Sequence, residues 1–241
     1  MANPSAAMLV IGDEILSGRT RDANMYHLAG RLTEMGIDLK EVRVVSDDGP
    51  EIIAAINGLR DRFDHVFTSG GIGPTHDDIT ADNVAAAFGV NIGPRQDAID
   101  ILATNYANGH AELNEARMRM TRIPDGAVLI DNPISKAPGF TIGNVHVMAG
   151  VPKIFEVMLD GLLPKLTGGD PVVSNSVRLD IPEGDVAGRL GEIADAFGDL
   201  SIGSYPFSNA QGYGTNIVMR GTDGARVAAA AVAVRVAFDA D

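Results

Sequence analysis

The chain has no cysteine and no tryptophan, and aromatic residues make up only 5% of its 241 positions. The absence of cysteine excludes disulfide bonds and thiolate zinc sites. No apolar run approaches the roughly 20 residues that a transmembrane helix needs, and the longest covers only residues 227–234. The first residues lack the basic start of a secretory signal. We therefore expect a cytoplasmic protein that makes no contact with a membrane.

Basic residues are also scarce, with 19 Lys and Arg against 32 Asp and Glu, and the formal net charge is −13. Such a chain repels nucleic-acid phosphates unless it carries a local basic stripe, and the sequence shows none. Residues 188–191 (GRLG) match a Gly-x-x-Gly loop with which some small domains clamp RNA. They fall within a predicted helix and include a single arginine. We therefore do not expect nucleic acid among the partners.

Hydrophobic residues make up 45% of the chain, which is enough for a packed core. A length of 241 residues fits one larger domain and one smaller domain. Residues 167–171 (TGGDP) interrupt the patterns on either side and predict a linker. We therefore predict domains at residues 1–167 and 172–241.

In the first domain, strand patterns alternate with helix patterns. Residues 6–11 form a continuous apolar run, which is typical of a strand that is buried on both faces. Residues 22–35 carry apolar side chains at three- and four-residue steps, as an amphipathic helix does. Further strands are predicted at 39–45, 65–69, 127–130 and in a hairpin over 139–150, and further helices after Asp48, through 84–88, near 98–106 and 113–120, and from Pro152. This order predicts an α/β fold with a parallel sheet and right-handed crossovers.

The second domain follows a strand–helix–strand–strand–helix order. Its strands are predicted at 174–181, 201–207 and 214–221, and its helices at 185–197 and 224–238. About seventy residues in this order predict a small α+β domain.

Ligands of open parallel sheets bind beyond the carboxyl ends of the strands, so the loops after the first three strands are the candidate site. These loops are residues 12–18 (GDEILSG), 46–51 (SDDGPE) and 69–78 (SGGIGPTHDD). Each loop carries small residues and acids, and we expect the three to meet at one sheet edge. Gly12 and Glu14 are the candidates from the first loop, although Glu14 can also be a solvated loop residue.

The third loop is rich in glycine, and glycines allow several backbone N–H groups to point at one anion. A helix that starts near Asp78 would add its positive end. The residues expected to contact a phosphate ligand are Ser69, Gly70, Gly71, Gly73 and Thr75. The alternative is a tight turn that binds nothing. The spacing matches neither the dinucleotide fingerprint nor a Walker loop.

Two aspartates are the candidates for catalysis. Asp78 can hold Mg²⁺ or another divalent metal on the phosphate of the ligand, although a cap on the following helix is the expected role for one of Asp77 and Asp78. Asp47 faces a similar alternative, because one of Asp47 and Asp48 caps the next helix while the other can point into the site. His76 is a lone loop histidine, and we expect it to be neither a base nor a ligand.

These motifs resemble a known family. Residues 68–80 (TSGGIGPTHDDIT) resemble the Gly-Gly-x-Gly-Pro-Thr…Asp-x-Thr motif of the molybdopterin-binding (MoaB/MogA-like) domain of molybdenum-cofactor biosynthesis. Residues 11–39 are closer to the amino-terminal domain of the CinA family, a branch shared with the domain fused to eukaryotic FAD synthase. Residues 137–140 (APGF) and 149–155 (AGVPKIF) are similar to later motifs of the family, and the unit from Val172 onward resembles the small KH-like domain of CinA proteins.

The resemblance implies a three-layer α/β fold with a mostly parallel sheet and a pocket for molybdopterin or a nucleotide phosphate. By motif, the two aspartates that serve insertion or adenylylation in the cofactor-synthesis members fall on Asp47 and Asp78. In CinA-type relatives, the same pocket is linked to hydrolysis of the pyrophosphate in ADP-ribose or FAD. We also expect a homo-oligomer, either a dimer or a trimer.

The chain departs from the family pattern at two points. Asp77 stands where the cofactor-synthesis members usually carry arginine, which removes a positive charge from the phosphate site and argues against molybdopterin adenylylation. Ala149 replaces the usual proline before GVP. Two functions remain open: a metal-dependent pyrophosphatase for ADP-ribose-like dinucleotides, and a non-catalytic module that binds a pterin or a nucleotide.

Overall fold

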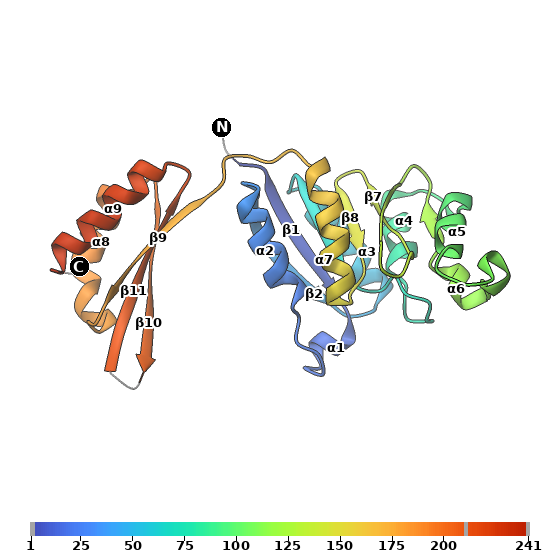
Figure 1. Cartoon of the computed structure of the whole chain (residues 1–241), viewed down its shortest axis with the longest axis horizontal. Coiled ribbons are helices and arrows are strands. Elements are labelled where there is room, and N and C mark those ends of the chain that lie inside the picture. The colour runs from blue at the N-terminus through green and yellow to red at the C-terminus, as the bar shows by residue number, and fades with distance from the viewer. Residues whose placement is uncertain (1–2, 210–211, 240–241) are drawn as a thin grey trace. The chain divides into compact units, whose positions relative to one another are not determined.

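The computed structural model describes residues 3–209 and 212–239 (Figure 1). The chain forms two compact units, Met1–Gly169 and Asp170–Asp241, and each unit has hydrophobic core clusters of its own. Among the described residues, no helix is both long and apolar enough to cross a bilayer.

The first unit is built on a six-stranded sheet with the strand order β2-β1-β3-β8-β7-β6. Its strands are β1 (Ser5–Ile11), β2 (Asp38–Val45), β3 (His65–Ser69), β6 (Val128–Ile130), β7 (Gly139–Ile142) and β8 (Val145–Met148). β1 runs parallel to β2 and β3, and β3 runs parallel to β8. The hairpin of β7 and β8 and the pairing of β6 with β7 are antiparallel. The sheet is therefore mostly parallel, as the sequence predicted.

Helices cover both faces of this sheet (Figure 1). α2 (Asn24–Glu34) and α7 (Pro152–Leu162) contribute to the core on one face, and α3 (Gly49–Arg60) and α4 (Thr80–Phe88) contribute to the core on the other. The arrangement is a three-layer α/β/α sandwich, which confirms the predicted fold class.

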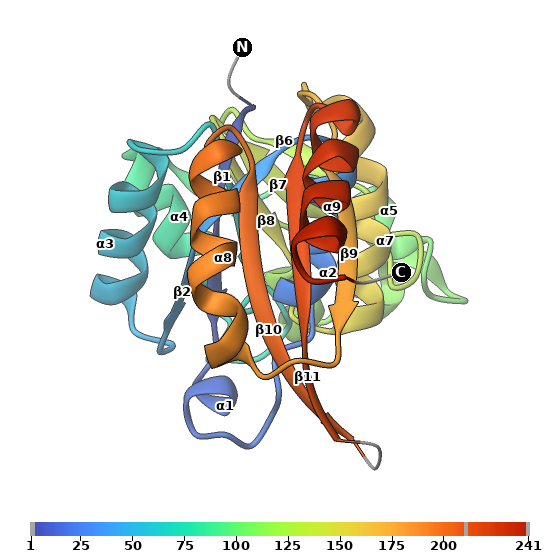
Figure 2. The same ribbon diagram turned by 90° about the vertical axis from the view of Figure 1, so that its left-hand side faces the viewer.

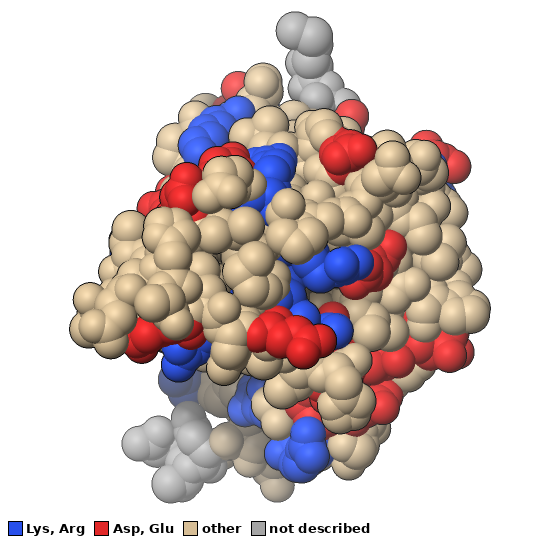
Figure 3. Space-filling model, turned by 90° about the vertical axis from the view of Figure 1, so that its right-hand side faces the viewer, with Lys and Arg blue, Asp and Glu red and all other residues tan. Residues whose placement is uncertain are grey.

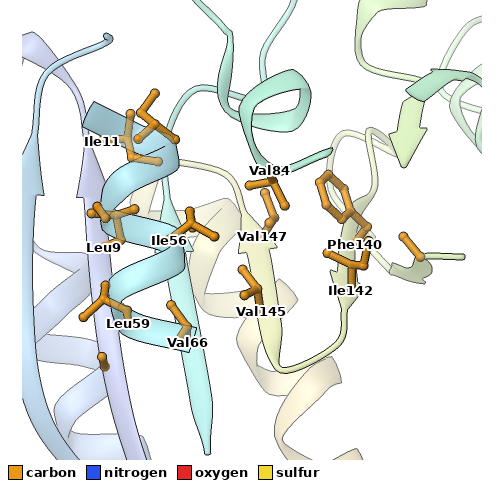
Figure 4. Close-up of a cluster of buried hydrophobic side chains, with 14 of the residues drawn as sticks. Leu9, Ile11, Ile56, Leu59, Val66, Val84, Phe140, Ile142, Val145 and Val147 are labelled. Atoms are coloured by element: carbon orange, nitrogen blue, oxygen red, sulfur yellow. The ribbon is translucent and has the colours of Figure 1, made fainter. Parts of the chain in front are cut away.

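Alternate residues of β1 point into the two cores. Leu9 lies in the core under α3 and α4, where Figure 4 shows it near Ile56, with Val84 and Val147 in the same cluster. Met8 lies in the core under α2 and α7. Because β1 is buried from Ala6 to Ile11, its continuous apolar sequence follows from its place in the middle layer.

The first unit also contains short elements that the sequence did not predict. β4 (Ile92–Pro94) and β5 (Arg122–Pro124) form a two-stranded antiparallel sheet, and a one-turn helix, α1 (Asp13–Leu16), follows β1. Three-residue strands show no alternation by which they could be recognised. The remaining elements are α5 (Gln96–Ala103), η1 (Gly109–Glu112), α6 (Glu115–Arg119) and η2 (Leu163–Lys165). The predicted helix over 113–120 is thus shorter than expected, because α6 begins only after its cap, Asn114.

The second unit is a three-stranded antiparallel sheet with the order β10-β11-β9. Its elements are β9 (Val173–Leu179), α8 (Glu183–Ala196), β10 (Ser201–Asn209), β11 (Gly212–Gly221) and α9 (Gly224–Ala237). Both helices pack on the same face of the sheet (Figure 2) and share its apolar core. Residues 188–191 (GRLG) lie inside α8, so they form helix and not a loop that could clamp RNA.

A pair of histidines lies within the first sheet, His146 buried and His65 half-buried. His146 of β8 is 3% exposed and stacks near Phe67 of β3, with 5.0 Å between ring centroids. Its Nδ1 lies 3.0 Å from Thr141 Oγ1, and its Nε2 lies 3.2 Å from Nδ1 of His65. Burial, with a smaller contribution from the charge of His65, lowers the pKa of His146 to about 3. His146 is therefore neutral in the folded chain near neutral pH.

This pair predicts a loss of stability in mild acid. The unfolded chain binds a proton at the ordinary histidine pKa of 6.5, whereas the folded chain does so only near pH 3. The free energy of unfolding is therefore not reduced by His146 above pH 6.5. Below this pH it decreases, by up to about 1.4 kcal/mol per pH unit, until the pH reaches about 3. Urea unfolding at about pH 7 and about pH 5 measures this slope.

In His146→Gln the slope should be smaller, because the titrating group is gone. His76→Gln is the matched control, since the side chain of His76 is 99% exposed, and it should keep the slope of the wild type. Equal slopes in all three proteins would show that His146 does not set the acid sensitivity.

Candidate functional site

The loops after β1, β2 and β3 lie together at the carboxyl ends of these strands. The backbone N–H of Asp13 donates to Asp47 Oδ2 at 3.0 Å, which joins the first loop to the second. The third loop approaches the end of β1, directly before the first loop, at Gly70, where an added Cβ would lie 2.1 Å from the carbonyl oxygen of Ile11. The sequence prediction that these three loops meet at one edge of the sheet agrees with these contacts.

Asp47 is partly buried between the loops. Burial raises the pKa of its carboxyl above the ordinary value; the N–H of Asp13 opposes this rise, and the charges of Asp13, Glu14 and Asp77 add to it. Asp48 has a different role, because its carboxylate accepts a backbone N–H in the first turn of α3 at 3.2 Å and caps this helix. Of the two neighbouring aspartates, Asp47 is therefore the one that faces the other loops.

Gly12 and Glu14 are in close contact in the first loop. An added Cβ on Gly12 would lie 2.5 Å from Glu14 Oε2, so the Glu14 carboxylate folds back over the backbone. Its charge acts on Asp47. Glu14 is thus half-buried beside the site, and it is not a fully solvated loop residue.

The glycine loop has a shape that other residues would not adopt. Gly70 and Gly71 have φ angles of 110° and 67°, which L side chains disfavour. An added Cβ on Gly71 would also lie 2.1 Å from Thr80 Oγ1. Within the described residues, the backbone N–H groups of Gly71, Ile72 and Gly73 have no acceptor. Three adjacent donors are therefore free to bind an anion.

Asp78 closes the glycine loop on itself. Its Oδ2 accepts the backbone N–H of Thr75 at 2.8 Å and the Thr75 hydroxyl at 2.6 Å, and an added Cβ on Gly73 would lie 2.6 Å from the same oxygen. Neither Asp77 nor Asp78 caps the following helix, because α4 begins at Thr80 and has no side-chain cap. The expected cap is wrong: the helix starts after these residues, and Asp78 stabilises the loop instead.

In the described ranges, no group of three or more His, Asp and Glu side chains is arranged to hold a metal ion. The carboxylates of Asp13, Glu14 and Asp77 nevertheless lie near enough to Asp47 for their charges to raise its pKa, after the larger effect of burial. Mg²⁺ commonly uses one or two carboxylates and completes its shell with waters and ligand phosphates. One or two of these acids could serve such a shared site, but together they do not form a metal cage. The His76 side chain is 99% exposed and contacts Asp77 at 4.0 Å.

Asn24 is a residue of this region that the sequence did not reveal. It is 3% exposed at the start of α2, and its Nδ2 donates to Ser69 Oγ at 2.7 Å and to the carbonyl oxygen of Gly150 at 2.8 Å. These bonds join α2 to the ends of β3 and β8, directly before the glycine loop. An asparagine at a helix start indicates a cap, and no local pattern reveals partners so far along the chain.

A hollow adjoins the glycine loop. It is lined by Ile72, Gly73, Asp78, Ala81, Asp82, Arg119, Met120, Arg122, Ile123, Pro138 and Phe140. On the face of the first unit that carries α5 and α6, Lys and Arg side chains gather near the middle, beside acidic ones (Figure 3). Arg122 pairs with Asp82, and Arg119 Nη2 donates to the carbonyl oxygen of Asp78 at 3.3 Å. Arg119 thus brings a positive charge to the loop from another part of the chain, which the sequence did not predict.

Both units match known protein families. Residues 7–168 match the family described as a probable molybdopterin binding domain, and residues 171–241 match the middle domain of FAD synthase. The first match covers more than half of the chain.

Two curated relatives illustrate the similarity. A protein of Saccharolobus islandicus (strain L.S.2.15 / Lassen #1) is 37% identical over 171 residues, which cover 69% of this chain and 65% of the relative. A protein of Caenorhabditis elegans named probable FAD synthase is 35% identical over 227 residues, which cover 84% of this chain and 44% of the relative. The chain therefore spans less than two thirds of the length of either relative.

A solved structure is also similar to the first unit. It is the protein CinA, with unknown function, from Thermoplasma acidophilum, and it matches at a TM-score of 0.63 and 34% identity, over 67% of this chain and 97% of that chain. The three-layer fold, the glycine loop and these matches all indicate the same family. The chain belongs to the molybdopterin-binding domain family of the MoaB/MogA type, in its CinA branch.

Proposed function

We propose that this chain binds the diphosphate of a dinucleotide such as ADP-ribose or FAD at the glycine loop and hydrolyses it with a divalent metal. The observation that carries this proposal is the placement of Asp47, a partly buried carboxylate with a raised pKa, among the loops that also present the free N–H groups of residues 71–73. The similarity to FAD synthase proteins supports a nucleotide as the ligand.

In the proposed reaction, the N–H groups of residues 71–73 bind phosphate oxygens and hold the diphosphate in place. A water oxygen attacks one phosphorus atom, the bond to the bridging oxygen breaks, and two phosphate monoesters leave. Asp47 accepts the proton of the attacking water, a role that its raised pKa favours. Asp78 keeps the loop closed through Thr75, and its carboxylate would be a ligand for Mg²⁺. When bound, Mg²⁺ would neutralise charge on the phosphate oxygens.

A second candidate function is a non-catalytic module that binds a pterin or a nucleotide. It is favoured by the engagement of Asp78 with Thr75 and by the lack of a complete metal cage among the described residues. Both functions need the glycine loop. Only the hydrolase needs Asp47 for turnover, so substitutions separate the two.

The first prediction of the proposed function concerns the glycine loop. Gly71→Ala should abolish binding of ADP and of inorganic pyrophosphate, because the added Cβ meets Thr80 Oγ1 and the loop must shift. Gly89→Ala is the matched control, since Gly89 has a similar φ of 65° with open space around it. Both variants should lose about 1–2 kcal/mol of stability from the disfavoured φ. Titration calorimetry measures binding, and full affinity in Gly71→Ala would show that the loop is only a turn.

The second prediction separates the two aspartates. Asp47→Asn should lower Mg²⁺-dependent hydrolysis of ADP-ribose by about a hundredfold or more while ligand affinity changes little. Asp78→Asn should weaken Mg²⁺-dependent binding and also lower the melting temperature, because the bonds to Thr75 are weakened. The exposed Asp61, which lies outside this site, provides the control Asp61→Asn. A wild type that binds these ligands but hydrolyses none of them with any common divalent metal would leave only the binding module.

The third prediction is a pH dependence. Asp47 must be ionised to accept a proton, so kcat/KM should fall as the pH decreases through its pKa, which lies above the ordinary value of 3.8. Asp77→Asn removes one of the charges that raise this pKa and should move the acidic limb of the profile to lower pH. Asp61→Asn should leave the limb in place. An acidic limb that moves in neither Asp77→Asn nor the double variant Glu14→Gln/Asp77→Asn would count against Asp47 as the titrating base, because both charges raise its pKa.

A further inference from the structure

The hollow beside the glycine loop contains an unused hydrogen-bond donor. Each of its two carboxylates has one oxygen engaged, since Asp78 Oδ2 accepts from Thr75 and Asp82 Oδ1 pairs with Arg122. Arg119 is different. Its Nε is buried and has no partner within the described part of the chain, and its Nη2 makes a single long bond of 3.3 Å to the carbonyl oxygen of Asp78.

Buried polar atoms without a partner are rare in folded proteins, and one at a site calls for an explanation. Among the described residues, no ion pair joins Arg119 to a carboxylate, and its charge acts on Asp77 of the glycine loop only as a minor cause of the lowered pKa of that carboxyl. By contrast, Arg117 in the same short helix is held by Glu112 and lies over the ring of Tyr106. The guanidinium of Arg119 is therefore held weakly beside the loop that carries the free N–H groups.

We propose that Arg119 anchors the ligand by turning from the carbonyl oxygen of Asp78 to an oxygen of the phosphate held by the free N–H groups of residues 71–73. A guanidinium binds phosphate through two parallel N–H bonds, which would employ both the unpaired Nε and the loosely held Nη2. Gly73 and Arg119 line the same hollow, so one phosphate can meet backbone donors and the guanidinium together. This inference rests on the proposed binding of a diphosphate at the glycine loop.

The test compares Arg119→Gln and Arg119→Lys with the wild type and with Arg117→Gln, a control from the same helix that does not line the hollow. Calorimetry with Mg²⁺ measures the affinity for inorganic pyrophosphate, ADP and adenosine. Arg119→Gln should lower the affinity for pyrophosphate and the affinity for ADP by the same factor, about tenfold or more. Arg119→Lys should recover part of the loss, because it keeps the charge but not the two-bond geometry. Arg117→Gln should change neither affinity by more than about twofold.

Stability provides the second readout. A purely structural Arg119 would make Arg119→Gln less stable in urea, whereas removal of an unpaired buried Nε should leave the stability unchanged or raise it. A loss of affinity for ADP without a loss for pyrophosphate would assign Arg119 to the nucleoside and overturn the phosphate contact. Wild-type affinity in Arg119→Gln would overturn this inference alone. A wild type that binds neither pyrophosphate nor ADP would overturn the proposed function, and this inference with it.

Discussion

The site depends on one close approach of backbone to backbone, where the third loop leaves β3. Gly70 lies so near the carbonyl oxygen of Ile11 that no Cβ fits between them, and Gly150 lies against Gly70 with only 3.2 Å left for its own Cβ. The ends of β1, β3 and β8 are thereby brought to one point. Asn24 joins the same point through Ser69 and Gly150. Any displacement at this point would move the N–H groups of the glycine loop relative to Asp47.

Much of the fold could be predicted from the sequence because its main signals are local. The unbroken apolar run at 6–11 marks a central strand, and the apolar spacing over 22–35 marks the helix that Asn24–Glu34 forms. The pairing of β4 with β5 could not be predicted, since three residues are too few to show a period. The start of α4 was placed too early because Asp78, which looks like a cap, uses its carboxylate within the loop.

The candidate site also contains residues that could be predicted from the sequence and residues that could not. The rule that ligands bind beyond the carboxyl ends of parallel strands identified the three loops from the sequence. These loops contain Gly12, Asp47 and Gly71. Asn24 and Arg119 could not be predicted as site residues, because their hydrogen-bond partners lie far away in the chain. Asn24 is 45 residues from Ser69, and Arg119 is 41 residues from Asp78. Such contacts follow from the packing of whole elements, and no short window of sequence contains them.

The glycine loop constrains how chains that share this scaffold can diverge. Its free donors belong to the main chain at residues 71–73, so the proposed binding of an anion does not depend on the identity of a side chain there. The groups proposed to react, by contrast, are side chains on neighbouring loops. In the proposed function, recognition and reaction are thus encoded separately, and substitutions of the reacting side chains can exchange one chemistry for another while the main chain still binds a phosphate.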